Sequence, residues 1–333
     1  MDNPEKGSGL TMMLERSNEI GADRKFVGKS IRKNGYGRDG HLKIIELYSS
    51  PSGLPSAIDI VNNKLILLGP GGVVGEAIGI PKAGRSERLK DAAERLINDE
   101  KIQDVLGRKL IVTILKPNSL AKNLFEKDPQ KRAHYNEYIC NLHRNTLIEL
   151  TSFNPRPNVD FVYTDVALFD RGPYDDIFWS YALKEADLID DIEKDDALKI
   201  SARSVRDKLI DIVFGINVPP ATSLRREEKR GEGYGNVMNP EFLPIIHAIY
   251  MKAEREEKLR IGLFSLYKEG RITESDYSDQ TKGFLIRQTR YISVNGEDSK
   301  EINSDKFFNP LRGQLLYNHG VSEELEHLLE KSA

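Results

Sequence analysis

The side chains best suited to chemistry in this sequence are the serines that follow its first apolar run. Residues 42–48 (LKIIELY) are apolar enough for a buried strand, and residues 49–56 (SSPSGLPS) come directly after them. A loop that binds nucleotide phosphates occupies this place between a strand and a helix, and its motif is G-x-x-x-x-G-K-[ST]. Ser56 keeps the hydroxyl of the motif. The two glycines and the lysine are replaced by Ser49, Leu54 and Pro55.

We therefore predict a degenerate phosphate-binding loop over residues 49–56. Its N–H groups would stand at the start of a helix and would include those of Ser50, Ser52 and Gly53. The hydroxyl of Ser56 would contact a magnesium ion. Pro55 offers neither a cationic side chain nor an N–H group, so the loop is expected to bind an ATP phosphate less tightly than an intact motif does.

A second group of side chains with chemical potential follows the apolar run 161–169. Asp170 and Arg171 stand at its end, where a buried parallel strand meets the ligand-binding edge of its sheet. After Pro219-Pro220 comes a segment with three arginines that could neutralise a phosphoryl group during transfer, namely Arg225, Arg226 and Arg230. Two simpler roles stay open. Asp170 would cap the following helix, and the arginines would pair with neighbouring glutamates.

The elements that would position these side chains alternate between strands and helices. Apolar runs predict strands over 42–48, 64–68, 109–115, 161–169 and 209–218. Helical spacing of apolar residues predicts helices over 52–62, 85–106, 130–152, 175–186 and 240–258. Such alternation is typical of an α/β fold in which a mostly parallel sheet is flanked by helices.

Composition divides the chain into three parts. Residues 1–40 are rich in glycine and basic side chains and are predicted to be an irregular extension. Residues 41–258 hold the alternating elements and are predicted to form the α/β domain. Residues 259–333 are predicted to form a C-terminal α+β extension.

The composition of the 333 residues indicates a globular protein from a reducing compartment. Apolar residues make up 39% and charged residues 30%, and no apolar run approaches the roughly 20 residues that cross a bilayer. The polar and charged residues 1–9 lead us to expect no secretory leader. Cys140 is the only cysteine of the sequence, which excludes disulfides within it. We therefore expect a cytoplasmic protein without a membrane partner. The formal net charge of -3 gives no general attraction to nucleic acid.

Four segments, in this order, resemble landmarks of the thymidylate kinase branch of the P-loop nucleoside and nucleotide kinases. They are the loop 49–56, the stretch 70–78 (PGGVVGEAI), the triplet Asp170-Arg171-Gly172 with the upstream helix segment 141–144 (NLHR), and the segment 223–227 (SLRRE). The second is similar to the family's P-G-G-T-x-x-G-E-x-I stretch but is one residue shorter. The resemblance covers about residues 42–255 and implies a three-layer P-loop kinase-like fold.

The resemblance also implies roles for individual side chains. Asp170 would hold a metal-bound water or accept the proton of the acceptor, and Arg171 would contact the acceptor phosphate. The acceptor would be bound by Arg144, Gly71 and Gly72, and the lid over the transferring phosphoryl group would carry Arg225, Arg226 and Arg230. The implied cofactors are ATP and Mg²⁺, and the family's common assembly is a homodimer.

Three functions follow from these patterns. The first is a divergent kinase that transfers a phosphoryl group from ATP to a nucleoside or nucleotide, with Lys82 or Lys29 in place of the lost lysine. The second is a catalytically inactive relative, a pseudokinase that serves as a binding or regulatory module, and the damaged loop favours it. The third is a nucleic-acid-binding protein that uses the basic residues 24–38, which local charge alone supports.

Overall fold

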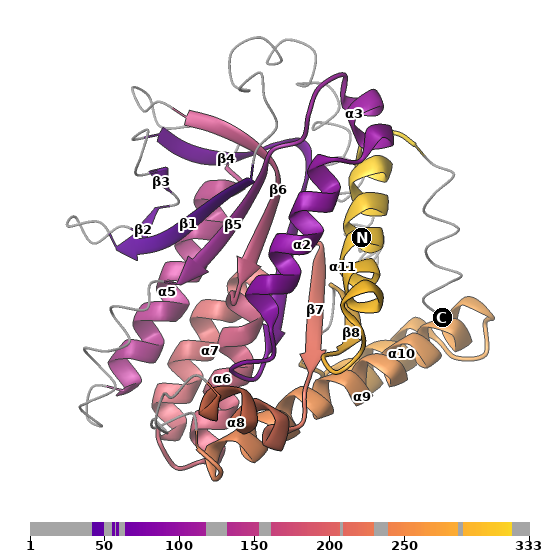
Figure 1. The fold of residues 1–333 in the computed structure, drawn as a ribbon. Coiled ribbons are helices and arrows are strands. Elements are labelled where there is room, and N and C mark those ends of the chain that lie inside the picture. Colours follow the sequence, from indigo (N-terminus) through magenta and orange to yellow (C-terminus); the bar gives the residue numbers. More distant parts are fainter. Residues whose placement is uncertain are drawn as a thin grey trace, which may run out of the picture.

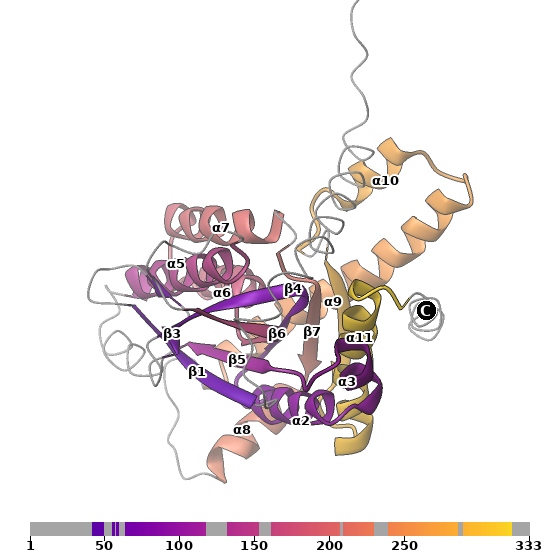
Figure 2. The same cartoon turned by 90° about the horizontal axis from the view of Figure 1, so that it is seen from above.

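A mostly parallel sheet between two layers of helices forms the body of the protein (Figures 1 and 2). The computed structural model describes residues 42–49, 55–56, 58–59, 64–117, 132–152, 161–206, 209–229, 239–285 and 289–321. The predicted α/β class is confirmed, with helices on both faces of the sheet as the three-layer prediction requires.

Six strands of the sheet run parallel to one another. In spatial order they are β1 (Leu42–Ser49), β5 (Val112–Pro117), β6 (Phe161–Asp170), β4 (Lys64–Gly79), β7 (Ile212–Asn217) and β8 (Arg290–Asn295). The chain leaves β4 towards β5 and leaves β7 towards β8, although β4 and β7 are neighbours. Ligands in open α/β sheets bind at such a point of divergence, beyond the carboxyl ends of the strands.

Helices cover both faces of the sheet. One face carries α2 (Arg85–Ile97), α3 (Glu100–Leu106) and α11 (Lys300–Asn318), and the other carries α5 (Arg132–Leu150), α6 (Pro173–Glu185) and α7 (Asp191–Arg206) (Figure 2). The long α9 (Phe242–Lys268) packs on α6 and, with α10 (Glu274–Thr281), extends beyond the sheet. The short α8 (Pro220–Glu228) lies beyond the carboxyl ends of the strands (Figure 1).

The helix predicted over residues 52–62 is wrong. Pro55–Ser56 forms the short strand β2, which pairs antiparallel with the end of β1, and Ile58–Asp59 forms β3, which pairs antiparallel with the start of β4. The predicted phosphate loop at 49–56 therefore has no helix N-terminus behind Ser56. Its remaining residues, Ser50, Ser52 and Gly53 among them, lie outside the described residues.

The strand predicted over 64–68 does not end at Pro70. It continues as β4 to Gly79, and the proline-glycine pair lies at a shift of register against β6, between Leu68 and Val73. Gly71 adopts a φ of 72°, and a Cβ there would lie 2.8 Å from the His319 ring. The glycines thus allow a β-bulge inside a buried strand.

The last part of the chain contributes to the central sheet. The predicted boundary at residue 258 falls inside α9, and the residues beyond it supply β8 to the sheet and α11 to its face. Phe307 of α11 is buried and stacks on Phe214 of β7 with ring centroids 4.3 Å apart. The three-layer body therefore reaches the end of the described chain at residue 321.

Candidate functional site

A loop with the spacing of a phosphate-binding motif joins β4 to α2. Residues 79–86 read GIPKAGRS, which is G-x-x-x-x-G-K-[ST] with arginine in place of lysine. The backbone is left-handed at Lys82 (φ 60°) and Gly84 (φ 85°), and Gly79 has a φ of 150°. Both glycines of the motif thus stand where a side chain would be strained. We refer to residues 79–86 as the phosphate loop.

Asp170, at the end of β6, joins the last two residues of the phosphate loop. Its Oδ1 accepts a hydrogen bond from Nε of Arg85 at 3.3 Å, and its Oδ2 accepts one from the hydroxyl of Ser86. The guanidinium of Arg85 also donates to the carbonyls of Gly79 and Ile80. The structure therefore brings the predicted Asp170 together with an arginine and a serine that the sequence analysis overlooked.

Helix α8 lies against the phosphate loop, as the predicted lid would. Arg226 donates to the carbonyl of Lys82 at 2.9 Å, and Ser223 donates to the carbonyl of Pro81. Lys82 Nζ pairs with Glu227 at 2.7 Å. Arg225 is exposed and donates to the hydroxyl of Thr222. Of the predicted lid arginines that lie within the described residues, Arg225 and Arg226, only Arg226 reaches the phosphate loop.

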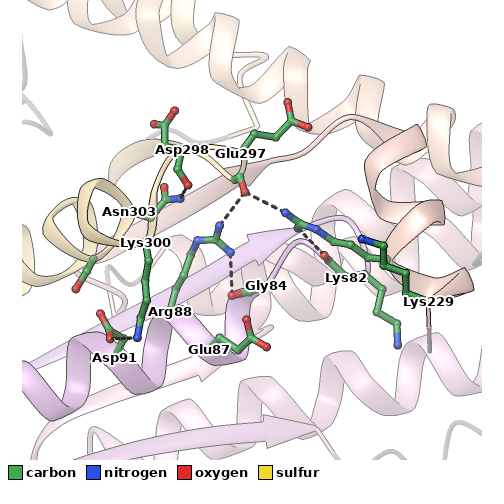
Figure 3. A pocket seen from close by; sticks show the side chains of 13 residues that line it. Lys82, Gly84, Glu87, Arg88, Asp91, Lys229, Glu297, Asp298, Lys300 and Asn303 are labelled. Carbon is green, nitrogen blue, oxygen red and sulfur yellow. Dashed lines mark hydrogen bonds and ion pairs between the residues drawn. The ribbon is translucent and has the colours of Figure 1, made fainter.

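A pocket of about 560 Å³ opens between α2, α8 and the turn that follows β8 (Figure 3). Arg88 of α2 and Arg226 of α8 both donate to the carbonyl of Gly296, at 2.9 and 3.2 Å. Burial, followed by the charge of Arg226, lowers the pKa of Arg88. Lys300 lines the same pocket but is paired with Asp91 at 3.1 Å (Figure 3). The two guanidiniums thus meet at a carbonyl, a weaker acceptor than the carboxylate or phosphate that they match best.

Three further carboxylates cluster behind Asp170 at the start of α6. Glu76 of β4 accepts the N–H groups of Tyr174 and Asp175, at 3.1 and 2.7 Å, and so caps the helix. Asp175 accepts the hydroxyl of Tyr250, and Asp176 contacts Nδ1 of His143 at 2.9 Å. The prediction that Asp175 and Asp176 belong to the first turn of a helix is confirmed.

Burial raises the pKa of Glu76 well above its ordinary value of 4.5, and the charges of Asp175 and Asp176 raise it further, against two backbone hydrogen bonds that lower it. The folded state therefore binds this proton more tightly than the unfolded state does. The free energy of unfolding therefore falls as the pH rises from the pKa of Glu76 in the unfolded state towards its higher pKa in the folded state.

Replacing Glu76 with glutamine should therefore change the pH dependence of stability. Relative to the wild type, Glu76→Gln is expected to gain free energy of unfolding as the pH rises from about 4 to about 8, because glutamine carries no charge to bury. Urea unfolding at several pH values measures this difference. Ser180→Ala, which removes a buried neutral hydroxyl from α6, is the control. If the difference in free energy of unfolding between Glu76→Gln and the wild type does not change with pH, as expected for the control, the raised pKa of Glu76 would be contradicted.

Arg171 is held in a strained conformation at the end of β6. Its φ is 77°, in the left-handed region that non-glycine residues rarely adopt. Its guanidinium lies 4.8 Å from the centroid of the Trp179 ring, and its Nε is 3.6 Å from Asp175. Stacking on an aromatic ring beside a carboxylate holds the side chain in place, so contact with an acceptor phosphate would require it to leave Asp175.

The remaining predicted site residues lie elsewhere. Gly71 and Gly72 occupy the bulge in the interior of β4, away from its carboxyl end, so they do not border the phosphate loop. Arg144 lies on α5 beside His143, and its Nε has no hydrogen-bond partner among the described residues. Arg230 lies outside them, and Ser56 belongs to β2.

A sequence signal for the phosphate loop existed. Gly79 and Gly84 have the correct spacing, Ser86 follows, and the amphipathic helix predicted from residue 85 begins there. Arg85 stands where the motif has lysine, so the strict motif does not match these residues. Lys82, proposed as the substitute lysine, does lie in this loop.

None of the helices that the structure describes carries an apolar stretch able to span a bilayer. Within the same residues, no group of three or more histidine, cysteine, aspartate and glutamate side chains is arranged to hold a metal ion.

Comparison with known proteins gives a limited likeness. No protein-family model and no curated protein matches the sequence. Similar solved structures include deoxyadenosine kinase from M. mycoides with bound dCTP, which has a TM-score of 0.43 and 14% identity and covers 72% of this chain and 99% of that chain. The same enzyme with bound dATP has a TM-score of 0.41 and 14% identity, and covers 72% of this chain and 100% of that one.

Proposed function

We propose that the phosphate loop binds the phosphates of a nucleoside triphosphate and that the protein transfers the terminal phosphoryl group to a nucleoside or nucleotide. The observation that carries this proposal is the strand–loop–helix at residues 79–86. It combines the motif spacing, left-handed backbone at Lys82 and Gly84, and a hydroxyl, that of Ser86, at the carboxyl edge of a parallel sheet. The N-cap of α2 is Gly84, which has no side chain to cap the first N–H groups of the helix, and an anion at this position could accept them.

The adjoining pocket supplies the donor subsite in this proposal. Its volume of about 560 Å³ is within the range of small-molecule sites. Arg88 and Arg226 repel each other across the Gly296 carbonyl, and an anion placed between them would relieve that repulsion and accept from both. We therefore place the donor phosphates over the phosphate loop and beside these two arginines.

The acceptor would approach from the side of Asp170 and Arg171. A hydroxyl oxygen of a nucleoside, or a phosphate oxygen of a nucleotide, would attack the terminal phosphorus. The bond from that phosphorus to the bridging oxygen would break, and the nucleoside diphosphate would leave with the bridging electrons. Asp170 would take the hydroxyl proton once it separates from Ser86, and Arg171 would turn from Asp175 towards the acceptor.

One observation supports a second candidate, a nucleotide-binding module without transfer. Both oxygens of Asp170 are engaged, one by Arg85 and the other by Ser86, so the group best placed as a base is occupied. In this alternative, nucleotide binds in the pocket and the chemistry does not follow.

Calorimetry with ATP and ADP tests the binding step. Arg88→Ala and Arg226→Ala are each expected to weaken nucleotide binding about tenfold or more, because each removes a charge-assisted contact to phosphate. Arg225→Ala is the matched control, since this neighbour contacts Thr222 and not the loop, and its affinity should stay within about twofold. Absence of ATP and ADP binding at millimolar concentration would refute the proposal.

A transfer assay separates the two candidates. Labelled ATP is offered with a panel of nucleosides and nucleotides, and Asp170→Asn is expected to abolish any transfer that the wild type shows. ATP binding without transfer to any acceptor on the panel would favour the binding module.

A further inference from the structure

The residue that distinguishes this phosphate loop from the intact motif is Arg85. Its side chain is only 10% exposed, and it turns towards Asp170, while its second arm returns to the carbonyls of Gly79 and Ile80. Burial opposes its charge, but Asp175 and Asp170 outweigh burial and raise the pKa of Arg85. The guanidinium is therefore a permanent cation among the carboxylates of the site.

The carboxylate that a magnesium ion would use, that of Asp170, already accepts hydrogen bonds from two donors. Magnesium is bound through one or two protein oxygens, waters and the substrate phosphates, and here the available protein oxygens are the Ser86 hydroxyl and the Asp170 carboxylate. One Asp170 oxygen accepts from Arg85 and the other from Ser86. A divalent cation at this carboxylate would also face the Arg85 charge at close range, so the residues as arranged do not fit the metal.

The neighbouring carboxylates provide no substitute. Glu76 accepts two backbone N–H groups of α6, Asp175 accepts the Tyr250 hydroxyl, and Asp176 contacts His143. All three are buried. Recruiting any of them to a metal would break a buried contact that stabilises the start of α6.

We infer that Arg85 takes the place of the divalent cation in this site, so that the protein binds the free nucleotide about as tightly as its magnesium complex. The inference rests on the proposed function, because it concerns nucleotide bound at the same loop. Arg85 would neutralise Asp170 and meet the phosphate charge, two tasks that lysine and metal share in an intact motif.

Calorimetry of ADP and ATP in excess magnesium chloride and in EDTA tests the inference on the whole chain. For the wild type, the two dissociation constants should agree within about threefold. Arg85→Lys should free Asp170 from its cation, since the single ammonium group of lysine cannot bond both Asp170 and the loop carbonyls as the guanidinium does. Binding should then become about tenfold tighter in magnesium than in EDTA. Arg88→Lys is a change of the same kind one turn along α2. It should raise the dissociation constants in magnesium and in EDTA by the same factor and so leave their ratio unchanged.

The outcomes separate this inference from the proposed function. Wild-type binding that is tenfold or more tighter in magnesium would overturn the inference and leave the proposed function intact. The inference would also be overturned if Arg85→Lys, with far-ultraviolet circular dichroism like that of the wild type, had equal dissociation constants in magnesium and in EDTA. Arg85 would then not be the cause of magnesium-independent binding. If Arg85→Lys does not fold, the wild-type ratio decides. Failure of the wild type to bind nucleotide in either buffer would refute both.

Discussion

Replacing Asp170 with alanine is expected to lower the free energy of unfolding by about 3–5 kcal/mol, because it removes the carboxylate that pairs with the buried guanidinium of Arg85. The side chains of Asp170 and Arg85 are 9% and 10% exposed, so water reaches neither freely. Alanine would also remove the acceptor of the Ser86 hydroxyl. Urea unfolding at neutral pH measures the loss as a shift of the midpoint with an unchanged slope.

A double-mutant cycle shows whether the loss comes from the unpaired charge. Arg85→Leu alone should also destabilise the protein, since it leaves Asp170 without its cation. The variant with both substitutions should be more stable than the sum of the two losses predicts, by about 1–3 kcal/mol, because no charge of the pair remains buried. Strictly additive losses would mean that Asp170 and Arg85 do not stabilise each other.

Gly79→Ala is expected to lower the free energy of unfolding by about 3 kcal/mol, since it combines backbone strain with a backbone contact. The φ of 150° is costly for any side chain, and a Cβ would lie 2.7 Å from the carbonyl oxygen of Ile216 in the adjacent strand β7. That oxygen is part of a paired strand and cannot move without disturbing the sheet. Nucleotide affinity should fall with stability, because the phosphate loop begins at this residue.

Gly107→Ala provides the matched control for Gly79→Ala. Gly107, after α3, has a φ of 65°, but a Cβ there would meet no atom within 4 Å. Gly107→Ala should therefore lower the free energy of unfolding by about 1 kcal/mol, the cost of a left-handed conformation for alanine, and leave nucleotide affinity unchanged. Both variants are compared by urea unfolding and ADP calorimetry. Equal losses at the two positions would contradict a role for the contact with Ile216.

Much of the sheet could be predicted because parallel strands buried on both faces have continuous apolar sequences. Strand β6 runs from Phe161 to Asp170, and the prediction for 161–169 differs from it by one residue. Asp170 was identified because a polar residue at the end of such a strand lies at the ligand-binding edge. Its position beside the phosphate loop agrees with that reasoning.

The phosphate loop could not be assigned correctly, because two local signals pointed elsewhere. Pro70-Gly71-Gly72 favours a turn, and only pairing with β6 and packing against α11 turn it into a bulge that lets β4 run on to Gly79. The second signal is the missing lysine: the motif that begins at Gly79 has Arg85 at that position and does not match the strict pattern. Contacts such as Glu76 with the start of α6 join residues about a hundred positions apart, and no periodicity reveals them.

The turn after β8 has a consequence for synthesis of the protein. Arg88 and Arg226 converge on Gly296, and α11 then packs along α2. A growing chain can pair β4, β5 and β6 early, but it cannot complete the pocket until β8, Gly296 and α11 have been synthesised and have folded back. A nascent or prematurely terminated chain that ends before β8 would have residues 79–86 without the adjoining pocket. If nucleotide binds as proposed, it could not stabilise such a chain against degradation.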